Sequence, residues 1–306
     1  MPAPIQRIAI VGFGEVGGIF GSDFSSQGIE VSVFDILLVS PRHRPKMVSK
    51  AGKCRVTAAP TLADCLRGAD LVISAVTSSS AQDVARRAGR ILRPRQLFLD
   101  INSVSPEAKR RAARYVERSK AHFVEAAVMA AVPGPRLQVP MLLGGPHASR
   151  AASRLRPLGM NAMAFSEEIG IASAVKMCRS VMVKGFEALA VECLFAARRY
   201  GAESAVIESL SATYPTLGWK DRLPDYLVSR VAEHGLRRAA EMREVALALR
   251  SVRLDPVMAL ATAERQERLV REMARRKVRF GSADFSWRLL ADTLAPSKRR
   301  RRPKSD

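Results

Sequence analysis

The sequence predicts an α/β protein in which a doubly wound parallel sheet is followed by an all-helical C-terminal domain. Over the first 165 residues, short apolar runs rich in β-branched residues alternate with helical patterns. Strands of this kind are buried on both faces, as in a parallel sheet covered by helices. From about residue 167 onward the strand patterns stop, and long segments rich in Ala, Leu, Arg and Glu follow. The length of 306 residues is enough for two domains of ordinary size.

The elements follow in a simple order along the chain. The predicted strands are residues 8–11, 30–34, 71–76, 97–101, 123–128 and 139–145. The predicted helices between them are residues 15–27, 61–68, 80–90, 106–119 and 147–157. The helical part is predicted at 168–200, 203–211, 223–250, 255–276 and 283–294, with Pro and Gly between segments. We therefore place the sheet domain at 1–166, the helical domain at 167–296, and a tail at 297–306 that lacks the apolar content to fold.

The net charge of +21 is the most unusual bulk property. The tail SKRRRRPKSD holds six basic residues against one acidic residue, and the rest of the charge is spread over arginine-rich helices. A basic surface can associate non-specifically with nucleic acid or other anions. An arginine-rich proteome and a solvated tail explain the same charge. Because no basic patch with interleaved aromatic residues is present, we expect no specific nucleic-acid partner.

Several other classes of protein are not expected. No apolar run approaches the 18 residues of a membrane span. The N-terminal MPAPIQRIAIVGFG enters a strand pattern directly and lacks the parts of a signal peptide. The four cysteines form no CxxC pair, and the four histidines show no metal-ligand spacing. We therefore expect a cytoplasmic protein with reduced thiols and no metal site.

The segment IAIVGFGEVGGIF carries Gly12-x-Gly14-x-x-Gly17 between an apolar strand and a helical pattern. This context is typical of a Rossmann-type dinucleotide-binding domain. The first glycine permits a tight turn, the second lets the backbone approach a pyrophosphate, and the third lets the helix pack closely on the sheet. The start of the helix offers N–H groups and a positive dipole end to the phosphates. The expected cofactor contacts here are Gly12, Phe13, Gly14, Glu15, Val16 and Gly17.

Asp35 ends the next predicted strand, 18 residues after Gly17. In this place a carboxylate would accept hydrogen bonds from the adenosine ribose and repel a 2′-phosphate, which favours NAD. A simple loop cap is the alternative for Asp35. The basic residues just beyond it, at 42–46, would attract a 2′-phosphate, so NADP stays open. Cofactor contacts are also expected at the end of the strand predicted at 71–76, from Ala75, Val76 and Thr77.

Three further motifs follow the glycine motif in a recognisable order. They are DINSVSP at 100–106, FVEAAV at 123–128, and Gly170 followed six residues later by Lys176. Together the four motifs resemble the β-hydroxyacid dehydrogenase superfamily, which includes 6-phosphogluconate and 3-hydroxyisobutyrate dehydrogenases. The resemblance runs from residue 8 to about residue 200. Beyond it, the chain resembles a subfamily with a distinctive helical C-terminal domain and largely unassigned substrates.

Lys176 lies within EIGIASAVKMCRSVMVKGFE, which predicts one helix over residues 168–187. The resemblance implies that this lysine is the general acid/base, projecting into a cleft between the domains near the nicotinamide. Its apolar neighbours would lower its pKa toward neutrality, since burial disfavours a charged amine. The alternative is a structural lysine whose amine reaches the surface along an apolar stem.

The resemblance also implies where substrate binds. In the DINSVSP loop, Asn102 and Ser103 would form a carboxylate-binding pair, and Ser105-Pro106 at the end of the loop reads as a helix cap. After the third motif, Met129-Ala130-Ala131 stands where the family usually has Ser-Gly-Gly. This difference bears on which substrate binds more than on which reaction is catalysed. One turn after Lys176 the family usually carries an asparagine, where this chain has Ser180. The expected substrate contacts are Asn102, Ser103, Val128, Met129, Arg179 and Ser180.

The sequence lacks one acidic residue that a decarboxylating enzyme of this family would need. Phosphogluconate enzymes carry a second acid seven residues after the lysine, and here that position is Val183, which cannot transfer a proton. Glu187, reached through a water chain, is a weaker substitute. We therefore predict an NAD(P)-dependent oxidoreductase that transfers a hydride between the cofactor and a β-hydroxyacid-like carboxylate substrate without assisting decarboxylation.

The remaining expectations concern the alternatives and the assembly. The same scaffold could serve an imine reductase, in which a different proton donor would matter more than the lysine. It could also serve a non-catalytic dinucleotide sensor whose basic tail touches nucleic acid. The resemblance implies a homodimer formed through the helical domain.

Overall fold

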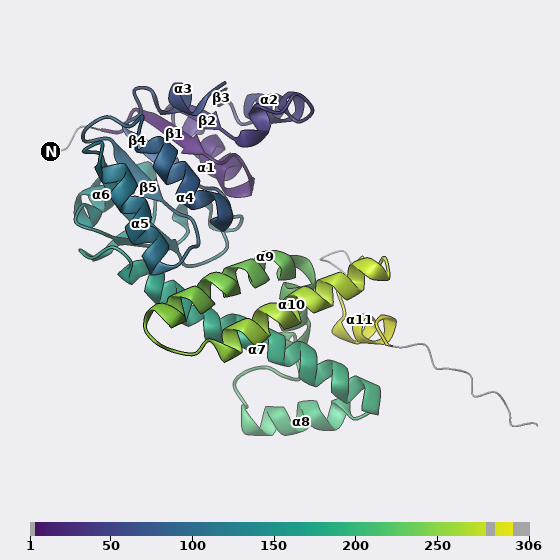
Figure 1. Cartoon of the computed structure of the whole chain (residues 1–306). Coiled ribbons are helices and arrows are strands. Elements are labelled where there is room, and N and C mark those ends of the chain that lie inside the picture. The colour runs from purple at the N-terminus through teal and green to yellow at the C-terminus, as the bar shows by residue number, and fades with distance from the viewer. Residues whose placement is uncertain (1–3, 280–284, 296–306) are drawn as a thin grey trace, which may run out of the picture. The chain divides into compact units, whose positions relative to one another are not determined.

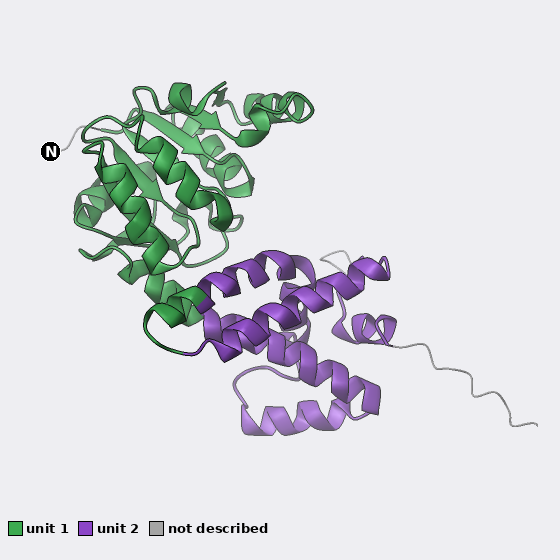
Figure 2. Cartoon of the chain, in the orientation of Figure 1, with its two compact units in different colours: residues 1–179, 247–254 green, residues 180–246, 255–306 purple. Residues whose placement is uncertain are grey.

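The computed structural model describes residues 4–279 and 285–295 (Figure 1). The tail predicted at 297–306 and the start of the helix predicted at 283–294 lie outside these residues. The chain divides into two compact units, residues 1–179 with 247–254 and residues 180–246 with 255–306 (Figure 2). The boundary predicted between residues 166 and 167 falls just before helix α7 (Ile171–Tyr200), whose residues are shared between the two units.

The first unit is built around one eight-stranded sheet with the order β3-β2-β1-β4-β5-β6-β7-β8. Its strands are β1 (Arg7–Val11), β2 (Glu30–Phe34), β3 (Thr57–Ala58), β4 (Leu71–Ser74), β5 (Leu97–Asp100), β6 (His122–Val128), β7 (Met141–Gly144) and β8 (Ala162–Ser166). All neighbouring pairs are parallel except β6 and β7, which are antiparallel. The strand order reverses between β1 and β4, so the predicted doubly wound, Rossmann-type fold is confirmed.

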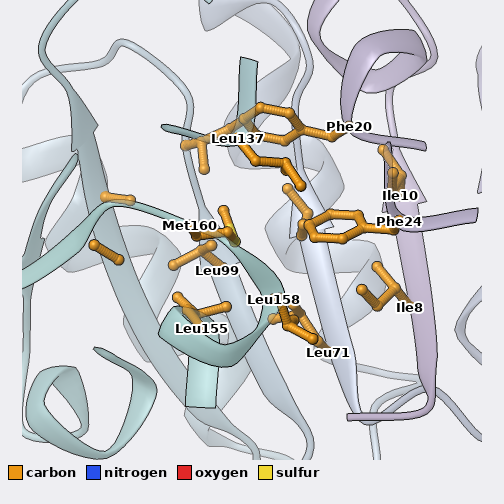
Figure 3. Close-up of a cluster of buried hydrophobic side chains, with 14 of the residues drawn as sticks. Ile8, Ile10, Phe20, Phe24, Leu71, Leu99, Leu137, Leu155, Leu158 and Met160 are labelled. Carbon is orange, nitrogen blue, oxygen red and sulfur yellow. The ribbon is translucent and has the colours of Figure 1, made fainter. Parts of the chain in front are cut away.

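Side chains of β1 alternate between two hydrophobic cores, one on each face of the sheet. Ile8 and Ile10 belong to one core, and Ala9 and Val11 belong to the other. The first core includes side chains of α1 (Glu15–Ser26), α2 (Arg44–Lys53) and α6 (Ala148–Leu155), and Figure 3 shows Phe20, Phe24 and Leu155 within it. The second core includes side chains of α3 (Leu62–Leu66), α4 (Ser78–Ala88) and α5 (Pro106–Glu117). Burial on both faces explains why the strands are almost entirely apolar.

Three elements of this unit have no counterpart among the predicted ones. Strand β3 has only two residues, too few for a pattern to show. Strand β8 lies at the edge of the sheet, and its side chains Met163 and Phe165 are exposed. Because these exposed positions are apolar, the sequence does not show the alternation of apolar and polar residues that marks a half-buried strand. Helix α2 contains a proline and buries only Met47 and Ala51, so no apolar stripe marks it. Short 3₁₀ segments complete the unit: η1 (Ile36–Leu38), η2 (Arg136–Gln138) and η3 (Arg156–Leu158).

The second unit is helical throughout its described residues. Besides part of α7, it contains α8 (Glu203–Thr213), most of α9 (Leu223–Ser251), α10 (Val257–Arg275) and α11 (Trp287–Thr293). Its core gathers Leu194 of α7, Val228 and Val231 of α9, and Trp287 and Leu290 of α11. No helix among the described residues has the length and apolar character needed to cross a bilayer.

Candidate dinucleotide and substrate site

The glycine turn connects the end of β1 to the start of α1. Gly12 has a φ of +96°, and a Cβ there would lie 2.3 Å from the carbonyl oxygen of Ala75. A Cβ on Gly17 would lie 2.1 Å from the carbonyl oxygen of Gly12. Both positions therefore require glycine. Gly14 differs, because a Cβ there would meet nothing within 4 Å. A side chain at Gly14 would fill space that a ligand could otherwise use.

The start of α1 is suited to a phosphate group. Its N-cap residue is Gly14, so no side chain caps the first turn. Uncapped N–H groups and the positive end of the helix dipole together form an anion-binding site. Phe13 is buried, so only its backbone can face a ligand, whereas Glu15 is exposed and Val16 is half-buried. The open space at Gly14 and the uncapped helix start fit the pyrophosphate of a dinucleotide.

Asp35 connects the end of β2 to this turn. One carboxylate oxygen accepts a hydrogen bond from the N–H of Phe13 at 2.8 Å, and the other accepts one from the N–H of Leu37 at 3.0 Å. The loop-cap role considered for Asp35 is thus present. A carboxylate has about four acceptor positions in all, so these two bonds leave it able to accept from a ribose as well.

A buried polar network holds the loop at the end of β4. The Asn102 side chain accepts a hydrogen bond from the N–H of Val76 at 2.7 Å and donates to the hydroxyl of Ser74 at 2.9 Å and to Asp100 at 2.7 Å. The ammonium of Lys109 lies 3.1 Å from the same Asp100 oxygen, and both of these side chains are buried. Asn102 is therefore placed to position Val76.

Ser103, the next residue along, is half-buried and is the accessible polar member of the expected pair. Ser105 caps α5 by accepting a hydrogen bond from the N–H of Ala108 at 3.4 Å, and Pro106 begins that helix. Lys109 and Ser74 were not among the predicted site residues. The pairing of β4 with β5 brings Ser74 to Asn102, and α5 carries Lys109 to Asp100.

Glu125 determines where the helix carrying Lys176 begins. This fully buried carboxylate on β6 accepts hydrogen bonds from the N–H groups of Gly170 at 2.6 Å and Ala172 at 3.2 Å, and from the hydroxyl of Ser173 at 2.6 Å. A Cβ on Gly144 of the neighbouring strand would lie 2.4 Å from the same carboxylate, so glycine makes room for it. The first turn of α7 is thus attached to the sheet through a residue of the third motif.

The segment after the FVEAAV motif also contacts α7 beyond Lys176. Lys176 is half-buried on α7, and the exposed Arg179 donates a hydrogen bond to the carbonyl oxygen of Met129 at 3.5 Å. Val128 is buried beside Met129, which is half-buried. Ser180 is buried and lies one helical turn after Lys176, where the second unit begins.

Glu187, two further turns along α7, is occupied by an ion pair. Both of its carboxylate oxygens accept hydrogen bonds from Arg238, at 2.8 and 2.7 Å. Burial raises the pKa of Glu187 above the ordinary value of a carboxyl group, while the charges of Arg238 and Lys184 oppose that shift. A carboxylate held on both oxygens is poorly placed to relay a proton.

Two histidines meet away from this region. His122 at the start of β6 and His147 before α6 contact each other, with Nδ1 of the first 2.8 Å from Nε2 of the second. Within residues 4–279 and 285–295, no three side chains of the His, Cys, Asp or Glu type come together as metal ligands would.

Comparison with known proteins decides the family. Residues 7–165 match the family described as the NAD binding domain of 6-phosphogluconate dehydrogenase. The chain belongs to that family. Residues 197–269 match a second one, described as a domain of unknown function (DUF1932). The expected resemblance, the Rossmann-type fold and the NAD(P) cofactor class are confirmed by the first match.

Three relatives illustrate the likeness. A solved structure of a conserved hypothetical protein from Sinorhizobium meliloti 1021 is 34% identical, with a TM-score of 0.77, over 95% of this chain and 96% of that chain. An uncharacterized 28.5 kDa protein from Methanothermus fervidus is 29% identical over 260 residues, which is 84% of this chain and 96% of the relative. A 3-hydroxyisobutyrate dehydrogenase from Pseudomonas aeruginosa is 25% identical over 215 residues, 66% of this chain and 68% of that enzyme.

Proposed function

We propose that this protein is an NAD-dependent dehydrogenase or reductase acting on a β-hydroxyacid-like carboxylate, with Lys176 as its general acid/base. The observation that carries the proposal is the Glu125 cap, which attaches the start of the lysine-bearing helix to the sheet that also holds the glycine turn. The family of residues 7–165 and the likeness to a 3-hydroxyisobutyrate dehydrogenase support the same reaction class.

Different residues of the chain are proposed to bind the cofactor and to transfer the proton. When bound, the nicotinamide dinucleotide supplies the hydride chemistry. Gly14 and the start of α1 would hold its pyrophosphate, Asp35 would bind its adenosine ribose, and Asn102 keeps Val76 in place beside it. Lys176 would accept the proton of the substrate hydroxyl during oxidation and return it during reduction. Such an acid/base is worth roughly 10²- to 10⁴-fold in rate.

Two polar side chains are proposed to bind the substrate carboxylate. The Arg179 guanidinium carries five N–H donors in a fork that matches a carboxylate, and it already reaches the third motif through Met129. Ser103 offers a hydroxyl from the loop that Asn102 anchors. We expect no assistance to decarboxylation from positions 183 and 187 of α7, since the first is a valine and Glu187 is held by Arg238.

The preference for NAD over NADP follows from Asp35. Its carboxylate is held in place by Phe13 and Leu37, and a fixed negative charge there repels a 2′-phosphate. The basic residues that favour the opposite preference (Arg42, His43, Arg44 and Lys46) are all exposed. Their charges are screened by solvent and salt more strongly than that of a half-buried carboxylate.

A panel of β-hydroxyacids, sugar acids and cyclic imines, assayed with NAD and with NADP, tests the proposal. The readout is the absorbance of the reduced nicotinamide. We expect turnover of at least one hydroxyacid with NAD, and a loss of roughly 10²- to 10⁴-fold in kcat for Lys176→Ala with NADH binding unchanged. Lys220→Ala removes an exposed lysine of the second unit as a control. Turnover by Lys176→Ala within about twofold of wild type, or turnover of cyclic imines alone, would contradict the proposal.

We also propose that the chain forms a homodimer through its helical unit. Met182 and Leu189 on α7 are 75% and 57% exposed. Because they are seven residues apart, they lie on the same face of the helix. Light scattering after gel filtration should give about twice the 33.4 kDa chain mass. The mass of a single chain would exclude the dimer.

A further inference from the structure

Lys50 on α2 binds the glycine turn in a way that the glycine motif itself does not require. Its ammonium group donates hydrogen bonds to the carbonyl oxygens of Phe13 and Gly14, both at 2.7 Å. The same nitrogen lies 4.5 Å from the centroid of the Phe13 ring. Lys50 is half-buried, and it reaches the turn from 36 residues further along the chain than Gly14.

The two carbonyl groups set the direction of two N–H groups. In a trans peptide the N–H points opposite to the C=O of the same unit, and the described residues contain no cis peptide bond. With the carbonyls of Phe13 and Gly14 turned toward Lys50, the N–H groups of Gly14 and Glu15 point away from it. The positive charge also polarises both peptide groups, which makes their N–H groups stronger donors.

Gly18 makes room for this lysine. A Cβ on Gly18 would lie 3.0 Å from Cε and 3.1 Å from Nζ of Lys50. Gly18 is not one of the three motif glycines, and the contact that its missing side chain leaves open is the one with Lys50. On the other side of the turn, Asp35 binds the N–H of Phe13, so the peptide groups flanking Phe13 are held at both ends.

We propose that Lys50 is a positioning residue for the dinucleotide pyrophosphate. It orients and polarises the peptide groups whose N–H donors face the phosphates, and it adds one positive charge behind them. The inference rests on the cofactor class and is independent of the substrate and of the role of Lys176.

Direct binding of NADH, followed by its fluorescence at fixed ionic strength, tests this role. We expect Lys50→Met to raise the NADH Kd by about tenfold, the value of one charge-assisted hydrogen bond. Lys53→Met removes an exposed lysine from the same helix and should change the Kd by less than about twofold. An unchanged Kd for Lys50→Met would overturn the inference.

Competition by ADP and by adenosine separates a phosphate effect from general damage to the turn. Lys50→Met should weaken ADP and leave adenosine within about twofold, since adenosine carries no phosphate. Equal weakening of both would indicate a merely structural role. Wild-type protein that binds neither NADH nor NADPH would overturn this inference and the cofactor together, whereas NADH binding without turnover would overturn only the proposed reaction.

Discussion

The carboxylate of Glu125 accepts a hydrogen bond from the hydroxyl of Ser173 at 2.6 Å, which ties β6 to the first turn of α7. The other carboxylate oxygen binds the N–H groups of Gly170 and Ala172. A side chain 48 residues earlier in the sequence thus satisfies the N–H groups that the start of a helix leaves without partners. This carboxylate therefore attaches the first turn of α7, three residues before Lys176, to the sheet.

Glu125→Ala should lower the free energy of unfolding by about 2–4 kcal/mol, because buried donors lose their acceptor. Glu125→Gln keeps an acceptor and a group that can bond to Ser173, so we expect a smaller loss. Urea unfolding measures both, and Glu168→Ala, an exposed acid beside the same helix start, serves as the control. A Glu125→Ala protein as stable as the control would contradict the anchoring role.

Gly14→Ala and Gly17→Ala should differ in kind. The methyl group at Gly17 meets a backbone carbonyl, so we expect a loss of at least about 3 kcal/mol in stability. The methyl group at Gly14 meets open space, so stability should change by less than about 1 kcal/mol while NADH binds at least tenfold more weakly. Thermal unfolding and NADH fluorescence separate the two effects. Normal NADH affinity in Gly14→Ala would show that the ligand approaches elsewhere.

The contact between His122 and His147 predicts an acid-sensitive fold. Burial lowers the pKa of both imidazoles below the ordinary 6.5. The neighbouring His147 ring and the positive charges of Arg150, Arg95 and Arg154 lower the pKa of His122 further, and Arg150 does the same for His147. Protonation therefore favours the unfolded chain. Stability should be unaffected above pH 6.5 and should fall as the pH drops from 6.5 through the lower folded-state pKa values.

His147→Gln tests this pH dependence. The slope of unfolding free energy against pH, measured between about pH 7.5 and 5.5, should be shallower in this variant. Part of the slope should remain, because burial lowers the pKa of His234 as well. His43→Gln, which changes an exposed histidine, should keep the wild-type slope. An unchanged slope in His147→Gln would rule out the histidine pair as its source.

The ion pair between Glu187 and Arg238 should respond differently to single and double substitution. Arg238→Met leaves a buried carboxylate without the nitrogen that donates to both of its oxygens, which costs roughly 3–5 kcal/mol. Replacing both residues, as Glu187→Leu with Arg238→Met, should return stability to within about 2 kcal/mol of wild type. Urea unfolding of the two single variants and the double variant forms the cycle. A double variant as unstable as the sum of the singles would argue against a direct pair.

Sequence determined those features that depend on neighbouring residues along the chain. The glycine turn is one of these features, because Gly12 and Gly17 lie within one short connection between a strand and the helix that follows it. The buried strands are another, since an apolar run buried on both faces looks the same wherever its partners lie. The Ser105-Pro106 start of α5 belongs to the same class.

Tertiary structure decided how the residues of the site are used. The hydrogen bonds of the Asn102 amide to Val76 and Ser74 arise because the pairing of β4 with β5 places these two residues beside it. Glu125 and Lys50 act on segments 48 and 37 residues away, so neither spacing nor periodicity points to them. Local patterns follow from backbone geometry and hydrophobic periodicity, which nearest neighbours specify. The direction of a polar side chain follows from which partners the packed sheet and helices bring within hydrogen-bond distance.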